Sequence, residues 1–191
     1  MALAIVDLHR RDVELVEQAT VLLYAAFRGR SAAWPDGVAA RREVLSSLTR
    51  GKISRVMVDD GETVIGWIAA QPSYADRVWE IHPIVVAEPH RGRGIGRALV
   101  ADLEGSLAAR GALTLWAGSD DEHGETSLGQ VDLYADLPEA LQRVGNFARH
   151  PYEFFLRLGF RIVGVMPDAN GWGKPDIFLA KRLAGEDAEL A

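Results

Sequence analysis

The sequence predicts one α/β domain with a mixed, mostly antiparallel central sheet and helices on both faces. Three observations lead to this prediction. The chain has 191 residues, 48% hydrophobic and 25% charged, which suits a single folded domain and excludes a disordered chain. Asp60-Gly61 lies between two apolar runs and predicts an antiparallel hairpin. Strand and helix patterns then alternate in the second half, which is typical of helices packed on a sheet.

The first half of the chain begins with an expected strand at 3–8. Apolar residues from Val13 to Phe27 recur at helical spacing, and Gly29 ends that helix. A loop containing Trp34 leads to a more polar helix at 38–50. Expected strands follow at 53–59, 63–70 and 78–86, rich in β-branched and aromatic residues.

The second half begins with a helix expected at 94–110, where Ile95, Leu99, Leu103 and Leu107 are spaced by four and Gly111 closes the element. The remaining strands are expected at 112–117, 160–166 and 177–181, and the remaining helices at 138–144 and 152–158. No linker, repeat or composition break divides the chain. Residues 1–184 are therefore expected to form one domain, and residues 185–191 an acidic tail.

Composition narrows the function classes. The chain has no cysteine, which excludes disulfides, Cys-ligated zinc and thiol catalysis. A net charge of −6 argues against nucleic-acid binding and favours a cationic partner. No secretory signal and no apolar run of about 20 residues is found, so we expect a cytoplasmic protein without a membrane partner. His82, His123 and His150 have no metal-ligand spacing, and no metal is expected.

The sharpest motif is Arg91-Gly92-Arg93-Gly94-Ile95-Gly96, between a Val-rich strand and a strong helix. Glycines let the backbone approach a bulky anion, and the N-terminus of the following helix adds partial positive charge. The spacing lacks the Rossmann register and the lysine of a P-loop, which argues against dinucleotides and ATP. A plain glycine turn is the alternative, but the two arginines favour a pyrophosphate site.

At this motif the chain resembles the GNAT acetyltransferase superfamily, whose coenzyme A loop reads Q/R-x-x-G-x-G/A, here Arg91, Gly94 and Gly96. The resemblance implies the GNAT fold and acetyl-CoA as cosubstrate. It implies that the strand Ile84, Val85, Val86 contacts coenzyme A, with Val85 and Val86 hydrogen-bonding the pantetheine arm. It further implies that the loop Arg91, Gly92, Arg93, Gly94, Ile95, Gly96 holds the pyrophosphate.

A more specific resemblance, to aminoglycoside 6'-N-acetyltransferases of the enterococcal type, covers about Tyr74 to Lys181. It is carried by the following stretches: Trp79-Glu80-Ile81-His82-Pro83, Gly118-Ser119-Asp120-Asp121, Thr126-Ser127-Leu128, Asp132-Leu133-Tyr134, His150-Pro151-Tyr152-Glu153-Phe154 and Asn170-Gly171-Trp172-Gly173-Lys174-Pro175-Asp176-Ile177. The first 70 residues match only vaguely, around Trp34.

This resemblance implies acetylation of the 6'-amine of aminoglycoside antibiotics, by direct transfer in a ternary complex, and a homodimer. Glu80 is then the expected catalytic base, because a carboxylate can hold an ammonium and accept its proton. Asp120 and Asp121 would attract the cationic acceptor, and Tyr74 and Trp34 would contact it. The alternatives are a cation-binding Glu80 at the rim, a solvated acidic loop and ordinary packing aromatics.

One position departs from the family pattern. Many members place a tyrosine four residues before the Gly-Phe that ends the last helix, as proton donor to the thiolate, and this chain has Phe155 there. Tyr152 or a water molecule could take that role, and Phe155 is expected to pack in the core. Two other functions therefore stay open: acetylation of a polyamine or protein amine, and a non-catalytic coenzyme A- or antibiotic-binding protein.

Overall fold

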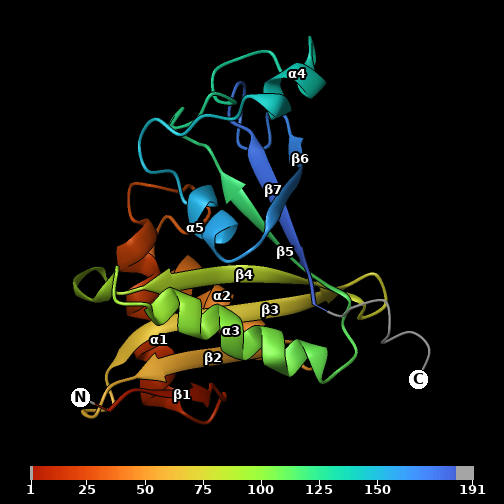
Figure 1. Cartoon of the computed structure of the whole chain (residues 1–191). Coiled ribbons are helices and arrows are strands. Elements are labelled where there is room, and N and C mark those ends of the chain that lie inside the picture. Colours follow the sequence, from red (N-terminus) through yellow and green to blue (C-terminus); the bar gives the residue numbers. More distant parts are fainter. Residues whose placement is uncertain (1, 184–191) are drawn as a thin grey trace. The chain divides into compact units, whose positions relative to one another are not determined.

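The computed structural model describes residues 2–183, which form two compact units (Figure 1). The first unit runs to Leu113 and includes Leu183, and the second is Thr114–Arg182. The predicted acidic tail, 185–191, lies outside the described residues. The expectation that 1–184 form one domain stays a prediction.

The first unit contains four strands and three α-helices. Its elements are β1 (Ala4–Asp7), α1 (Val13–Phe27), α2 (Gly37–Ser47), β2 (Ile53–Val58), β3 (Val64–Ser73), β4 (Val78–Val86), the 3-10 helix η1 (Glu88–His90) and α3 (Ile95–Ala108). Asp36 caps α2 by accepting a hydrogen bond from the Ala39 amide at 2.8 Å. The short η1 turn is the one element of this unit that the sequence patterns missed.

The strands of the first unit pair antiparallel in the order β1-β2-β3-β4. Helices α1 and α2 cover one face of this sheet and α3 the other (Figure 1). Trp67 and Val85 belong to the core cluster on the α1 and α2 face. On the α3 face, a Cβ at Gly66 would lie 2.9 Å from Leu99 Cδ1, so only glycine lets α3 pack this closely on β3.

Strand β4 contains a β-bulge. Ile68 pairs with Ile84 and Ala70 pairs with Ile81, so β4 carries one more residue than β3 in this stretch. The additional residue lies at His82-Pro83, whose peptide bond is cis. Bulges re-aim neighbouring side chains and are frequent beside functional sites. This bulge directly follows Glu80, the expected base.

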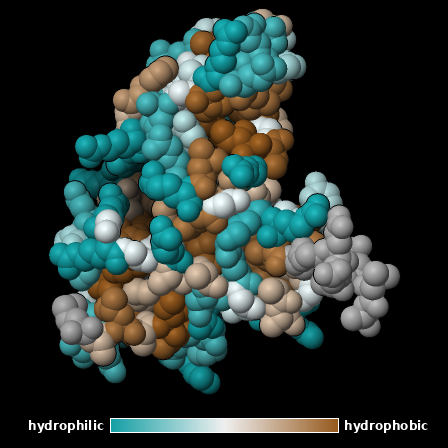
Figure 2. Space-filling view, viewed as in Figure 1, coloured by the Kyte–Doolittle hydropathy of each residue, from teal (hydrophilic) through white to brown (hydrophobic). Residues whose placement is uncertain are grey.

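The second unit contains β5 (Thr114–Asp120), α4 (Leu137–Gln142), α5 (Tyr152–Arg157), β6 (Arg161–Met166) and β7 (Asp176–Arg182). Its strands pair antiparallel in the order β5-β7-β6. Helix α5 packs on β6 and β7, where Phe155 and Phe160 lie edge-on to each other with ring centroids 5.4 Å apart. Figure 2 shows apolar surface over this unit's strands, where β6 exposes Val163 and Met166.

The predicted fold class is confirmed, since the strands pair antiparallel within each unit and helices lie on both faces of the first sheet. The expected core position of Phe155 is confirmed as well, because its side chain is buried. Strand β5 is longer than predicted and continues to Asp120, which pairs with Asp176. Asp120 is therefore the last residue of a strand and not the start of a loop.

Candidate active site

The glycine motif forms an open turn between β4 and α3. Gly92 and Gly94 adopt φ values of +74° and +84°, and a Cβ added at either would meet no atom within 4 Å. Gly94 is the N-cap of α3, and no side chain caps this helix end. The first-turn amides of α3 thus face open space with the positive end of the helix dipole, and Arg91 and Arg93 are exposed beside them. This arrangement suits a diphosphate group.

The strand before this turn directs its backbone groups alternately toward β3 and away from it. The Ala87 amide donates to Ile65 O at 2.9 Å, toward β3. Because successive residues of a strand direct their backbone groups to opposite sides, Val85 faces β3, whereas Ile84 and Val86 face away from it. Arg91 Nε donates to Val86 O at 3.1 Å and ties the turn to β4. The expected hydrogen bond from Val85 is thus corrected, since its backbone is used within the sheet.

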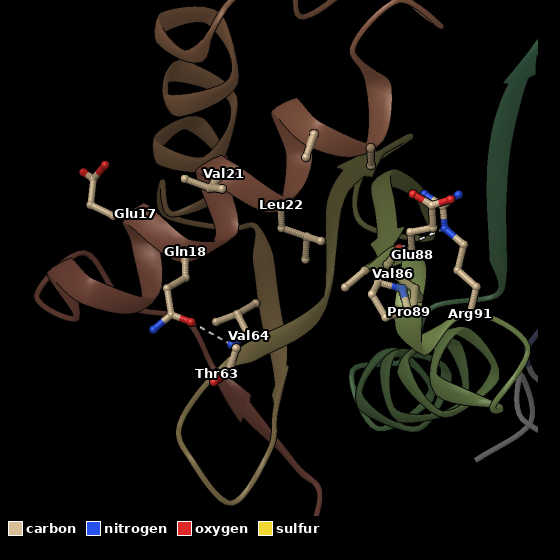
Figure 3. A pocket seen from close by; sticks show the side chains of 13 residues that line it. Glu17, Gln18, Val21, Leu22, Thr63, Val64, Val86, Glu88, Pro89 and Arg91 are labelled. Atoms are coloured by element: carbon tan, nitrogen blue, oxygen red, sulfur yellow. Dashed lines mark hydrogen bonds between the residues drawn. The ribbon is translucent and has the colours of Figure 1, made fainter.

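A cavity of about 570 Å³ adjoins the other side of the turn (Figure 3). Helix α1 and the start of β3 line it, together with Val86 and Arg91. The Gln18 side chain accepts a 2.7 Å hydrogen bond from the Val64 amide and so fixes α1 beside β3 (Figure 3). Glu80 is not among the lining residues, so this cavity is separate from the expected base.

Glu80 lies on β4 directly opposite Gln71 on β3. Gln71 Nε2 donates to Glu80 Oε2 at 2.8 Å. The other carboxylate oxygen, Oε1, lies 3.8 Å from His82 Nδ1, and His82 Nε2 lies 3.8 Å from Glu43 Oε2 on α2. The side chain of Glu80 is 19% exposed. The carboxylate is therefore held by a neutral donor and remains accessible, as a proton acceptor requires.

The resemblance pointed to Glu80 but not to Gln71 and His82, which lie beside its carboxylate, nor to Glu43, which lies beside His82. Glu80 and His82 are two residues apart on one strand, a spacing that places side chains on one face and could have indicated His82. Gln71 can be identified only from the register of β3 with β4, and Glu43 only from the packing of α2 against the sheet. No sequence signal marks these two residues.

The two aromatic residues expected to contact the acceptor have different environments. Trp34 is buried in the core cluster, lies edge-on to Phe27 with centroids 4.7 Å apart, and faces the His82 ring at 6.0 Å. Trp34 thus packs in the core, and its expected contact with the acceptor stays a prediction. Tyr74 is 82% exposed in the turn between β3 and β4 and is free to contact a ligand.

The second unit carries the two aspartates, and their environments differ. Asp120 is exposed, and its Oδ1 accepts a 2.5 Å hydrogen bond from Asn170 Nδ2. Its backbone oxygen lies 3.0 Å from the ring Nε2 of buried His150. The Asp120 carboxylate is thus fixed in direction at the end of β5. It remains a candidate for attracting a cation.

Asp121 is fully buried. Its Oδ1 accepts from the Glu125 amide at 2.7 Å, and its Oδ2 accepts from the amide and hydroxyl of Thr126 at 2.9 and 2.7 Å. These bonds close the loop after β5 around the carboxylate. The expected contact between Asp121 and a cationic acceptor is therefore corrected, because the geometry gives Asp121 the role of organising this loop.

Tyr152 is the first residue of α5 and is buried. Burial, with a smaller contribution from the charge of Glu153, raises the pKa of the Tyr152 phenol above its ordinary value of 10.0. The hydroxyl is therefore protonated at neutral pH. Phe155, in the slot that the family pattern gives to a tyrosine, stacks edge-on with Phe154 and Phe160 and offers no proton.

Within residues 2–183, no group of three or more histidine and acidic side chains is arranged to hold a metal ion. No helix in this range has the length and apolar content needed to cross a bilayer.

Residues 20–134 match the acetyltransferase (GNAT) family. No curated protein sequence matches the chain significantly. Among solved structures, an aminoglycoside 6'-N-acetyltransferase complexed with coenzyme A is 36% identical, with a TM-score of 0.87 over 96% of this chain and 98% of that chain. The enzyme of that name from Enterococcus faecium is also 36% identical, with a TM-score of 0.86 over the same shares. An aminoglycoside 6'-acetyltransferase type Ii is 32% identical, with a TM-score of 0.74 over 96% and 99%.

Proposed function

The chain belongs to the acetyltransferase (GNAT) family, and from this premise we propose that it transfers the acetyl group of acetyl-CoA to the 6'-amine of aminoglycosides. The observation that carries the proposal is the similarity, over nearly the whole chain, to aminoglycoside 6'-N-acetyltransferases, one of them complexed with coenzyme A. Two features of the structure support it chemically: the open glycine turn suits a diphosphate group, and the Glu80 carboxylate can accept a proton.

In the proposed site, Arg91, Arg93 and the first-turn amides of α3 hold the diphosphate of coenzyme A. The loop from Arg91 to Gly96 fits this group because its glycines leave the backbone uncovered and no side chain occupies the helix end. The backbone groups of Ile84 and Val86 serve the pantetheine arm and the thioester carbonyl. Acetyl-CoA supplies an activated acetyl group when bound.

Glu80 acts on the acceptor. An aminoglycoside amine is mostly protonated at neutral pH, and an ammonium has no lone pair for attack on a carbonyl. Glu80 Oε1 holds this ammonium by charge and then accepts one proton, while Gln71 keeps the carboxylate in place. Asp120 and Tyr74 attract and contact the rest of the polycation. The Tyr152 hydroxyl gives its proton to the departing thiolate, and the second proton lost from the acetylated nitrogen restores the phenol.

The proposal is tested by mixing the protein with acetyl-CoA and a panel of aminoglycosides with and without a free 6'-amine. Thiol release and product mass are followed together. We expect a gain of one acetyl group only where the 6'-amine is present. Acetylation confined to polyamines or peptides would replace the aminoglycoside as substrate, and binding of both ligands without product would indicate a non-catalytic protein.

Three further properties remain predictions: a homodimer, a cytoplasmic location and selection as a resistance enzyme. Sedimentation equilibrium measures the first. Expression in a susceptible bacterium, with growth followed against aminoglycosides that have or lack the 6'-amine, measures the last.

A further inference from the structure

His82 lies between two carboxylates, and each of its ring nitrogens faces one of them. Nδ1 is 3.8 Å from Glu80 Oε1, and Nε2 is 3.8 Å from Glu43 Oε2. Glu80 and His82 come from β4, and Glu43 comes from α2. The three side chains form a row from the catalytic strand to the helix that covers it.

The row begins at the free oxygen of the base. Gln71 occupies Glu80 Oε2 with a 2.8 Å hydrogen bond, so a proton taken from the acceptor is placed on Oε1, the oxygen that faces His82. Glu80 must lose this proton before the next turnover. Its own side chain is 19% exposed, whereas that of His82 is 42% exposed. The imidazole is therefore the better connected of the two to water.

The surroundings of His82 favour transfer along this row. The charged side chains that lie within 4.0 Å of its ring nitrogens in residues 2–183 are Glu80 and Glu43, and the aromatic ring beside it, Trp34, is neutral. Trp34 packs against one side of the imidazole, 6.0 Å between ring centroids, and is itself fixed by Phe27. The ring is thus supported in the orientation in which its two nitrogens face opposite carboxylates.

We propose that His82 and Glu43 form the proton outlet of Glu80, an inference that rests on the proposed function. An N–H bond of the acceptor ammonium breaks and an O–H bond forms at Glu80 Oε1. That O–H bond then breaks as an N–H bond forms at His82 Nδ1, and the proton on Nε2 leaves to Glu43 Oε2 and on to water. Loss of the Nδ1 proton to water and uptake of one at Nε2, through the exposed imidazole, then restore the starting tautomer. One proton passes from the ammonium to solvent in each cycle, and no electrons are exchanged.

Each 3.8 Å gap is longer than a direct hydrogen bond, which spans about 2.6–3.2 Å. One bridging water or a small rotation of the imidazole closes it. The outlet requires neutral His82 to carry its proton on Nε2, facing Glu43, before the transfer. Glu43 thereby has two roles: it selects this tautomer, and it receives the Nε2 proton during the transfer.

The test compares His82→Ala, His82→Gln and Glu43→Gln with Glu14→Gln, an exposed carboxylate in the first turn of α1 that removes the same charge. kcat is measured at saturating concentrations of acetyl-CoA and of whichever amine the wild type acetylates, in increasing concentrations of imidazole buffer. We expect kcat of His82→Ala to fall on the order of tenfold or more, below the roughly 10²- to 10⁴-fold of a direct base. Added imidazole should restore much of it, because the buffer takes the proton directly.

Glu43→Gln should lower kcat by a few-fold with both KM values unchanged, and wild type and Glu14→Gln should not respond to imidazole. An unchanged kcat in His82→Ala, or a loss that imidazole does not restore, overturns the outlet. A rise in acceptor KM for Glu43→Gln without a change in kcat also overturns it, by giving Glu43 a role in binding. If His82→Ala does not fold, His82→Gln, which cannot relay a proton, replaces it in the same assay.

A second measurement does not depend on turnover, so failure of the proposed function is distinguishable from failure of the outlet. The ¹⁵N signals of the His82 ring, assigned by their loss in His82→Gln, report which nitrogen carries the proton. We expect them to shift in both Glu43→Gln and Glu80→Gln and to stay in place in Glu14→Gln. If the ¹⁵N signals shift in neither Glu43→Gln nor Glu80→Gln, the proposed outlet is wrong even if the enzyme is active.

Discussion

Gln71 on β3 donates a 2.8 Å hydrogen bond to the carboxylate of Glu80 on β4, and the two residues are direct partners in the strand register. The bond fixes one oxygen of the proposed base and directs the other toward His82. A side chain on a neighbouring strand thus determines which oxygen is available for proton transfer.

The first prediction concerns this hydrogen bond. Gln71→Ala should lower kcat by about tenfold, because a hydrogen bond to a charged group contributes about 1.5–3 kcal/mol and its loss lets the carboxylate rotate. The acetyl-CoA KM should be unchanged. Steady-state kinetics with both substrates varied measure this. Gln71→Glu is the contrasting variant and should be worse, since a second negative charge replaces the donor. Wild-type kcat in Gln71→Ala would show that the bond does not position the base.

Removing the base itself gives the second prediction. Glu80→Gln keeps the shape and the contact with Gln71 but cannot accept a proton, so kcat should fall by about 10²- to 10⁴-fold. Calorimetric titration should show coenzyme A binding as in wild type, because the glycine turn is untouched. A decrease below tenfold would assign Glu80 to holding the ammonium alone.

Two glycine substitutions separate ligand binding from packing. Gly94→Ala places a side chain in open space but at φ +84°, a left-handed conformation that costs an L-residue roughly 1–2 kcal/mol. The turn should shift, and coenzyme A should bind several-fold more weakly. Gly66→Ala instead places a Cβ 2.9 Å from Leu99 and 3.0 Å from Ile95, and should lower the free energy of unfolding by about 1–3 kcal/mol.

Calorimetric titration and thermal unfolding of both glycine variants check this pair. The expected pattern is weak binding at Gly94→Ala and a lowered Tm at Gly66→Ala. Equal coenzyme A affinity in Gly94→Ala and wild type would argue against the turn as the diphosphate site.

The adjacent aspartates provide the fourth prediction. Asp121→Asn should lower the free energy of unfolding by about 2 kcal/mol or more, because a buried carboxylate that accepts three hydrogen bonds becomes a group that donates as well. Asp120→Asn should leave stability nearly unchanged and raise the acceptor KM about fivefold at low salt, since a close charge pair contributes roughly 1 kcal/mol in water. Added salt should reduce the difference in acceptor KM between Asp120→Asn and wild type, because it screens the charge pair.

Urea unfolding and acceptor KM across ionic strengths measure both variants. The result that contradicts the assignment is the reverse pattern, a stable Asp121→Asn with raised KM and an unstable Asp120→Asn.

The fifth prediction follows from the raised pKa of the Tyr152 phenol. Between the ordinary value of 10.0 and the higher folded-state value, the unfolded chain loses this proton while the folded protein keeps it. The folded state then binds more protons than the unfolded state, so stability decreases as the pH rises above about 10. Tyr152→Phe lacks this group, so its stability should decrease less steeply above pH 10. Chemical unfolding across that pH range, compared with wild type, measures the difference in slope.

Tyr152→Phe also tests the proposed proton donor. With no phenol to protonate the thiolate, kcat should fall at neutral pH while both KM values hold. An unchanged kcat would assign that proton to water and leave Tyr152 a packing role beside His150, whose ring centroid lies 5.7 Å away.

Element type could be predicted from the chain itself because hydrophobic periodicity is local. The spacing of Ile95, Leu99, Leu103 and Leu107 predicts α3, and Gly92 and Gly94 predict a turn that only glycine adopts freely. The end of β5 was missed because Gly118, Ser119 and Asp120 have low strand propensity. Pairing of this strand with β7 overrides that local preference.

The sequence by itself determined the α/β class and the glycine turn, because each depends on residue types at short spacing, and Glu80 became the candidate base through the resemblance to a family. Only the tertiary structure decided that Gln71 and Glu43 lie near Glu80 and His82, since strand register and helix packing join residues distant in the chain. It also decided which of two adjacent aspartates, Asp120 or Asp121, has a carboxylate exposed to solvent, although the two side chains are chemically identical. One ends a strand in solvent, and the other is enclosed by its loop, because burial is a property of the folded chain.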